Sequence, residues 1–186
     1  MKALLVALSM VLAAMPVAAA GLPGVYGAMV VQPVGLPERA EFDLTPAIER
    51  ARREHKRLYV YLAAHDCRFC RRYEAFLEQH ADELLPHFRR DYVIADLRSS
   101  LALLGRQVYI RLGATSRSYT DFQTSIGDER ARLLVYPNIW ILDAEGRPLM
   151  QMPTGAGTFE TVPEQIEVLQ LLPGWSHDKW LEKKHP

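Results

Sequence analysis

A short apolar run that ends at a pair of cysteines constrains this chain more than any other feature. Residues 58–64 read LYVYLAA, with aromatic and β-branched side chains, and residues 65–76 continue as HDCRFCRRYEAF. A nearly continuous apolar run of this length is typical of a central strand that is covered on both faces. A helical pattern begins at Cys67, so Cys67 and Cys70 are expected where a buried strand gives way to a helix.

The spacing of these two cysteines favours redox chemistry over a structural role. They are the only cysteines in the chain, and a disulfide across a two-residue gap would restrain little of the unfolded chain. At a helix start, unpaired backbone N–H groups would stabilise a thiolate at Cys67. Cys70 would lie one turn deeper on the same face. We therefore expect Cys67 to attack a partner disulfide and Cys70 to resolve the mixed disulfide.

The residues around the cysteines could support this chemistry. Arg68 adds positive charge beside the sulfurs, and a protonated His65 could stabilise a thiolate, although it could equally be a loop histidine without a role. Phe69 could shield the pair from water. The supporting residues that we expect in the site are His65, Asp66, Arg68 and Phe69.

The first twenty residues have the pattern of a secretory signal peptide. Lys2 precedes an apolar stretch, and small residues follow up to Ala20, so cleavage is expected after Ala20. The alternative is a retained membrane anchor, because the apolar stretch is close to the length of a span. Export would place the cysteines in an oxidising compartment, where disulfides persist.

The composition suits one neutral domain. Lysine plus arginine equals aspartate plus glutamate, 22 against 22, which argues against a nucleic-acid binder. After cleavage about 166 residues would remain, a length that suits a single domain. We divide the chain into a signal peptide (1–20), an N-terminal arm (21–43), an α/β domain (44–172) with an insertion at about 98–133, and a C-terminal tail (173–186).

Local patterns predict the elements of this domain. A helix should begin near Thr45 and Pro46, as N-cap and first helical residue, and a second helix should run from Cys67 until Pro86 breaks it. Further elements are a buried strand at 91–97, a strand–turn–strand hairpin at 138–152 and a final helix within 154–172. This succession predicts an α/β sandwich around a mixed sheet.

The insertion has the weakest pattern. We expect a helix near 99–106, a short element at 107–112, a loop at 113–118 and a helix that approaches Leu133.

Two segments carry a family resemblance. RLYVYLAAHDCRFCRRYEAFL, at 57–77, resembles the active-site strand, Cys-x-x-Cys loop and helix of the thioredoxin superfamily. It is similar in particular to exported thioredoxin-like proteins of bacterial envelopes, which include the periplasmic thioredoxins of sulfur-oxidation systems. VYPNIWILDAEGRPL, at 135–149, resembles the segment in which a cis proline starts a strand that leads into a hairpin.

The resemblance covers roughly 44–172 and implies a thioredoxin-like three-layer sandwich, with a central mixed sheet flanked by helices and an insertion before the cis-proline strand. It implies that Pro137 is cis and faces the disulfide, and that the backbone of Tyr136 binds an extended substrate chain. Gly155 and Gly157 resemble the small-residue turn that passes near such a site.

The chain also departs from the family pattern. Thioredoxin has a buried acidic residue six positions before the first cysteine, where this chain has Tyr61. The dipeptide between the cysteines is Arg68–Phe69 instead of Gly-Pro. These differences leave the redox direction open.

The resemblance implies a periplasmic thiol–disulfide oxidoreductase, and we favour a reductase. Its Cys67–Cys70 pair would exchange with cysteines of envelope proteins, and a membrane electron carrier could re-reduce it. It would need no cofactor beyond that disulfide and no metal, and would meet the membrane only through the signal peptide during export.

Two other classes of function stay open. Cys67, Cys70 and His65 could bind copper or zinc, with His80 and His87 as more remote ligands. The chain could also be a non-catalytic interaction module that docks through its insertion and its N-terminal arm.

Overall fold

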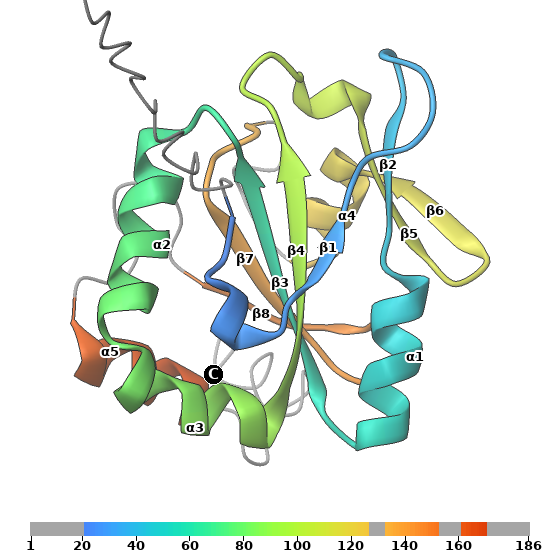
Figure 1. The fold of residues 1–186 in the computed structure, drawn as a ribbon. Helices are drawn as coiled ribbons and strands as arrows, with labels where there is room; N and C mark the ends of the chain where they lie inside the picture. The colour runs from blue at the N-terminus through green and yellow to red at the C-terminus, as the bar shows by residue number, and fades with distance from the viewer. Residues whose placement is uncertain (1–20, 127–132, 153–160, 171–186) are drawn as a thin grey trace, which may run out of the picture.

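The computed structural model describes residues 21–126, 133–152 and 161–170 (Figure 1). The predicted signal peptide, Gly155, Gly157 and the tail from 173 lie outside these ranges. Within the described ranges, none of the helices combines the length and the apolar character that crossing a membrane requires.

A five-stranded mixed sheet forms the centre of the molecule. Its strand order is β1-β4-β3-β7-β8. β1, β4 and β3 are parallel, whereas β7 runs antiparallel to β3 and β8 antiparallel to β7. The strands are β1 (Met29–Val31), β3 (Arg57–Ala64), β4 (Tyr92–Ser99), β7 (Asn138–Leu142) and β8 (Pro148–Gln151).

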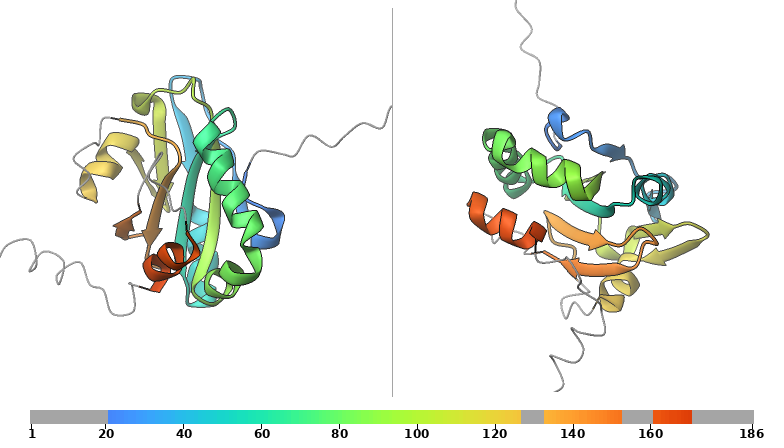
Figure 2. Two further views of the ribbon diagram at one scale, coloured as in Figure 1. Left: turned by 90° about the vertical axis from the view of Figure 1, so that its left-hand side faces the viewer. Right: turned by 90° about the horizontal axis from the view of Figure 1, so that it is seen from below.

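Helices cover both faces of this sheet. In Figures 1 and 2, α2, α3 and α5 lie on one face and α1 lies on the other. The helices are α1 (Thr45–Glu54), α2 (Arg68–Gln79), α3 (Ala81–Asp91), α4 (Tyr119–Ser125) and α5 (Val162–Gln170), with 3-10 turns η1 (Gly24–Tyr26) and η2 (Gly105–Gln107). A β-α-β unit followed by a β-hairpin and a helix gives the predicted α/β sandwich, a central mixed sheet flanked by helices, and this fold class is confirmed.

The alternation of side chains along the central strands explains how the two helical layers are held. Every residue of β7, and every residue of β3 after Arg57, is buried. Successive side chains of a strand point to opposite faces. Tyr59 therefore meets Tyr73 of α2, with 2.7 Å between the hydroxyl oxygens, whereas Trp140 meets Phe122 of α4, with 4.8 Å between ring centroids.

A second, smaller sheet lies beside α1. It contains β2 (Ala40–Asp43), β5 (Val108–Leu112) and β6 (Thr115–Ser118), in the order β2-β5-β6. The helix expected near 99–106 is wrong, because only the 3-10 turn η2 forms there. The loop expected at 113–118 is also wrong, because that segment contains β6. This region forms strands because β5 pairs with β2, which lies nearly seventy residues earlier in the chain. A local sequence pattern cannot show such a pairing.

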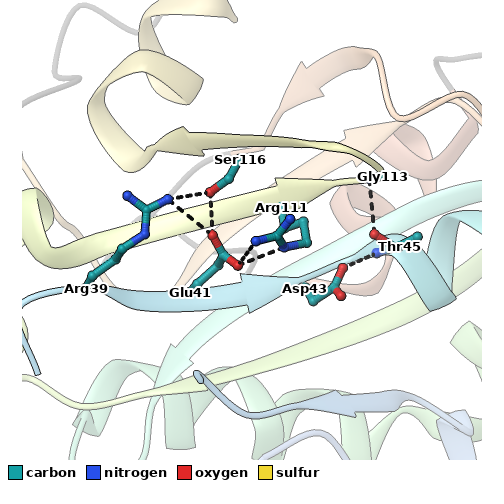
Figure 3. Close-up of polar contacts among 7 residues, drawn as sticks. All are labelled: Arg39, Glu41, Asp43, Thr45, Arg111, Gly113 and Ser116. Carbon is teal, nitrogen blue, oxygen red and sulfur yellow. Dashed lines mark hydrogen bonds and ion pairs between the residues drawn. The ribbon is translucent and has the colours of Figure 1, made fainter. Parts of the chain in front are cut away.

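Polar contacts around Glu41 join the three strands of the small sheet (Figure 3). Its carboxylate accepts hydrogen bonds from Nε of Arg111 on β5, at 2.7 Å, from Arg39, at 3.4 Å, and from the hydroxyl of Ser116 on β6. These bonds, led by that of Ser116, lower the pKa of Glu41. We call Arg39, Glu41, Arg111 and Ser116 the Glu41 network.

The start of α1 is also tied to the small sheet (Figure 3). The hydroxyl of Thr45 accepts the backbone N–H of Gly113, at 3.1 Å, in the turn between β5 and β6. The Oδ1 atom of Asp43 accepts the N–H of Thr45, at 2.9 Å. The helix α1 begins at Thr45, and Leu44 occupies its N-cap position. The prediction that Thr45 caps the helix is therefore wrong.

The single helix predicted from Cys67 to Pro86 is in fact two helices. α2 ends at Gln79, and α3 begins at Ala81 and contains Pro86 in its interior. Asp82 and Glu83 lie in the first turn of α3, where negative charge stabilises the positive end of the helix dipole. The helix therefore breaks at His80, and the expectation of a break at Pro86 is wrong.

Candidate active site

Cys67 occupies the N-cap of α2, directly after β3. Its backbone is extended, and its Sγ atom accepts the backbone N–H of Cys70 at 3.2 Å. Both cysteines are free thiols. The Cys67 sulfur therefore lies at the N-terminal end of α2 and contacts a backbone N–H group there.

Both cysteines are buried, with exposed fractions of 3% for Cys67 and 0% for Cys70. Burial raises the pKa of the Cys70 thiol, and its hydrogen bond with Cys67 adds to this shift. The two sulfurs therefore differ in the way that ordered exchange requires: one lies at the helix start, and the other is held protonated behind it.

His65 and Asp66 fix the cysteine loop to the end of β4. The Nδ1–H group of His65 donates to the carbonyl oxygen of Ser99, at 2.9 Å. The Oδ1 atom of Asp66 accepts the N–H of Leu101, also at 2.9 Å, and this bond lowers the pKa of Asp66. The side chains of His65 and Asp66 therefore help to position the cysteine loop.

Arg68 and Phe69 form the outer edge of the loop. Arg68 is exposed, and its guanidinium carbon lies 4.7 Å from the centroid of the Phe69 ring. Phe69 is half-buried and packs against the core. The pair therefore presents a positive charge and an apolar ring beside Cys67.

The second signature segment leads into β7. The peptide bond between Tyr136 and Pro137 is cis, the geometry that the resemblance implies for it. Tyr136 is buried, and its hydroxyl lies 2.6 Å from the Oγ atom of Ser99. Burial raises the pKa of Tyr136, and the charge of Cys70 adds to the shift.

Ser99 is a site residue that the sequence did not single out. Its carbonyl holds His65 and its hydroxyl holds Tyr136. It stands at the end of β4, and the parallel pairing of β3 with β4 brings it opposite Ala64. Only the strand register could have identified it.

Glu74 and Tyr61 were also missed as a pair. Glu74 follows Cys70 by four residues on α2, which places both on one helix face. The hydroxyl of Tyr61 donates to Oε1 of Glu74 at 3.1 Å. Burial raises the pKa of Glu74, and its negative charge contributes to the raised pKa of Cys70. The acidic group near Cys70 is therefore Glu74 of α2, whereas β3 has a tyrosine, Tyr61, at the position where thioredoxin has its acid.

A second carboxyl group lies behind Glu74. Asp96 is fully buried and stands opposite Tyr61 in the pairing of β3 with β4. Its Oδ2 atom accepts hydrogen bonds from Nε and a terminal nitrogen of Arg98, at 3.0 and 2.9 Å. Burial raises the pKa of Asp96. An acid inside the apolar run YVIADL was the signal that could have identified it. We call Glu74, Asp96 and Arg98 the buried acid cluster.

The residues considered as metal ligands do not converge in the described ranges. No group of three or more His, Cys, Asp or Glu side chains is placed there to hold a metal ion. His80 follows the last residue of α2, so the helix separates it from Cys67 by about 20 Å at 1.5 Å per residue. His87 lies further along, in α3.

Comparisons with known proteins add little to this description. No family model matches the chain, and no curated protein matches it. Among solved structures, the chain is similar to a thioredoxin-fold protein from Helicobacter pylori. The identity is 13% and the TM-score 0.43, over 69% of this chain and 79% of that one. The description of the site therefore depends on its own geometry.

Proposed function

We propose that this protein is an exported thiol–disulfide oxidoreductase that reduces disulfides of envelope proteins in the periplasm. The observation that carries the proposal is the unequal bonding of a buried Cys-x-x-Cys pair at a helix start. Cys67 accepts a backbone N–H there, whereas burial raises the pKa of Cys70.

The reaction follows from this asymmetry. The Cys67 thiolate attacks one sulfur of a client disulfide, which forms a mixed disulfide and releases the other client sulfur as a thiolate that takes up a proton. Cys70 then loses its proton and attacks the Sγ atom of Cys67. This step releases the second client thiolate and leaves a Cys67–Cys70 disulfide, so two electrons have passed to the client.

Glu74 is the group best placed to receive the Cys70 proton. It lies one helical turn from Cys70, and the hydroxyl of Tyr61 holds its carboxylate. A carboxyl group whose pKa is raised by burial is a better base than an ordinary one at neutral pH. We therefore assign Glu74 as the proton acceptor during resolution of the mixed disulfide.

The outer surface of the site supports binding of an extended client segment. Phe69 offers an apolar ring, Arg68 offers a positive charge, and the cis bond at Pro137 precedes the start of β7. Turnover would also require a dithiol carrier to re-reduce the Cys67–Cys70 disulfide, and a membrane electron carrier could supply those electrons.

The direct test compares the two single-cysteine variants on a disulfide-bonded model protein, with dithiothreitol as the electron source. Cys67→Ser should abolish reduction above the dithiothreitol background, because the thiol that remains, Cys70, is buried and has a raised pKa. Cys70→Ser should accumulate a covalent complex that mass spectrometry detects and that excess thiol releases.

Two results would contradict the proposal. One is full activity in Cys67→Ser; the other is the absence of a trapped complex in Cys70→Ser. Stoichiometric copper or zinc on the purified wild type, together with inactivity, would favour the metal-binding alternative.

A further inference from the structure

Residues 21–26, which we call the N-terminal strap, pack over α2 and β4. Leu22 and Tyr26 are buried, and the hydroxyl of Tyr26 donates to the carbonyl oxygen of Leu77 on α2, at 2.8 Å. The ring of Tyr26 packs edge-on against Phe88 of α3, at 5.3 Å between centroids. The start of the strap therefore has a fixed position in the fold.

This strap brings Gly21 onto the buried acid cluster. The backbone N–H of Gly21 donates to the carboxylate of Glu74, and the N–H of Leu22 donates to Oδ2 of Asp96, at 3.2 Å. Gly21 has a φ of +139°, and a Cβ atom there would collide with the guanidinium of Arg98. Only glycine fits this contact without rearrangement.

The cluster is one positive charge short. Glu74 approaches from α2, Asp96 and Arg98 come from β4, and the neutral hydroxyl of Tyr61 comes from β3. The cluster thus holds two carboxyl groups and one guanidinium, which is hydrogen-bonded to Asp96 and within Coulomb range of Glu74. The Oδ1 atom of Asp96 is buried and has no hydrogen-bond partner in the described part of the chain. Buried carboxylates are normally paired with cations and fully hydrogen-bonded. With Arg98 as its one cation, this site lacks a second cationic donor.

Cleavage at the predicted site would supply that donor. Hydrolysis of the Ala20–Gly21 bond by an endopeptidase consumes one water molecule, leaves a carboxylate on Ala20 and gives Gly21 an α-ammonium group. An amide nitrogen has one N–H donor, whereas an ammonium group has three. A small cavity lined by Gly21, Ala63, Ala64, His65, Glu74 and Arg98 adjoins this position.

We propose that the buried acid cluster is the binding site for the α-ammonium group of Gly21 in the cleaved protein. The ammonium keeps the existing bond to Glu74 and adds a positive charge beside Asp96. Because Glu74 also adjoins Cys70, removal of the leader completes the charge balance behind the thiol pair. A chain cut one residue earlier or later places its charge elsewhere.

The test compares a chain that begins at Gly21 with one that keeps Ala20. Every buried residue in the described ranges lies at Leu22 or later, so neither chain lacks any of the described core. With ¹³C-labelled glycine, NMR titration follows the Cα of Gly21 and reports the pKa of the α-amino group. This readout does not depend on thiol chemistry, so it can fail or succeed separately from the proposed function.

We expect the α-amino pKa of Gly21 to exceed the ordinary value of about 8 by about one unit or more. Glu74→Gln should lower it, whereas Glu78→Gln, an exposed carboxylate one turn later on α2, should leave it unchanged. An ordinary α-amino pKa in the Gly21 chain, insensitive to Glu74→Gln, would overturn the proposal.

Stability measurements give an independent readout on unmutated side chains. A raised pKa in the folded state means that the stabilisation is complete below the ordinary α-amino pKa and is lost as pH rises through the raised value. The Gly21 chain should therefore unfold at higher urea than its Nα-acetylated form at pH 7, and the difference should vanish at high pH. Equal midpoints at every pH would contradict the proposal.

The N-terminus of exported protein is a third readout. When the full chain is expressed with a secretion pathway, intact mass spectrometry of the processed product should show Gly21 as the first residue. A product that begins at another residue, or a chain that is never cut, would overturn the proposal.

Discussion

Two carboxylate-centred contacts in this molecule have opposite charge balances. In the Glu41 network, two arginines and a hydroxyl surround one carboxylate, which lowers the pKa of Glu41. In the buried acid cluster, one arginine accompanies two carboxyl groups and is hydrogen-bonded to one of them, Asp96, and burial raises the pKa of both carboxyl groups. The first contact is complete by itself and holds strands together. The second lacks a positive charge and lies beside the thiol pair. A carboxyl group there can take up or release a proton during thiol–disulfide exchange.

The largest effect that we expect on stability comes from the buried acid cluster. Asp96→Ala removes the carboxylate that accepts the hydrogen bonds of the Arg98 guanidinium and of the Leu22 N–H. Breaking a buried ion pair in this way costs about 3 kcal/mol of the free energy of unfolding. Urea denaturation measures it. The control Asp91→Ala removes a surface pair with Arg90 and should cost less than about 1 kcal/mol. Equal losses of stability in Asp96→Ala and Asp91→Ala would contradict the view that the buried pair contributes more than the surface pair.

The next prediction concerns the rate at which the mixed disulfide resolves. Glu74→Gln removes the acceptor of the Cys70 proton, so release of the second thiol should slow about a hundredfold. Stopped-flow kinetics with a small aromatic disulfide separates the two thiol releases. The first release, from attack by Cys67, should change little.

The pH dependence of this step has a definite sign. In the chain that keeps Ala20, resolution should accelerate as Glu74 loses its proton, with an apparent pKa above the ordinary carboxyl value of about 4.3. That limb should be absent in Glu74→Gln and present in Glu78→Gln. An unchanged profile in Glu74→Gln would show that another group accepts the proton.

The smallest effect should come from the Glu41 network. Glu41→Gln should cost about 1 kcal/mol at pH 7, because Arg39 and Arg111 are partly exposed and water screens the pairs. The lowered pKa means that Glu41 stabilises the fold above the ordinary carboxyl pKa, and that this stabilisation is lost as pH falls through the lowered value. Urea midpoints of wild type and Glu41→Gln should therefore converge in acid.

Glu74 should behave in the opposite way in the chain that keeps Ala20. Its raised pKa means that its contribution is complete below the ordinary carboxyl pKa and is lost as pH rises through the raised value. Relative to wild type, Glu74→Gln should thus gain stability between acid and neutral pH, whereas Glu41→Gln should lose it. The same sign in both variants would break the comparison between the two regions.

The sequence was sufficient for those parts of the fold that depend on local pattern. The apolar runs at 58–64 and 138–142 became the central strands β3 and β7, and Cys67 stands at the junction of β3 and α2 as predicted. Each of these features is a run or a spacing within one segment, and burial on both faces of a strand leaves a clear record in its composition.

The remainder depends on contacts between distant segments. β5 forms because β2 pairs with it, and Ser99 enters the site because β3 and β4 are in register. Glu74 and Asp96 meet because α2 packs over that register, and Gly21 reaches them from the chain start. These contacts between distant segments have no local signature. The i, i+4 spacing of Cys70 and Glu74 does have one, but the comparison with thioredoxin directed attention to the strand position of Tyr61.

The central claim is that Cys67 and Cys70 form a reversible redox couple, and one measurement tests it directly. The cleaved chain is equilibrated with graded ratios of reduced and oxidised dithiothreitol or glutathione, and the free thiols are trapped and counted by mass. The account predicts a single two-electron transition with a potential nearer the thioredoxin value of about −270 mV than the roughly −120 mV of strong oxidants. Thiols that remain reduced at every ratio would contradict it.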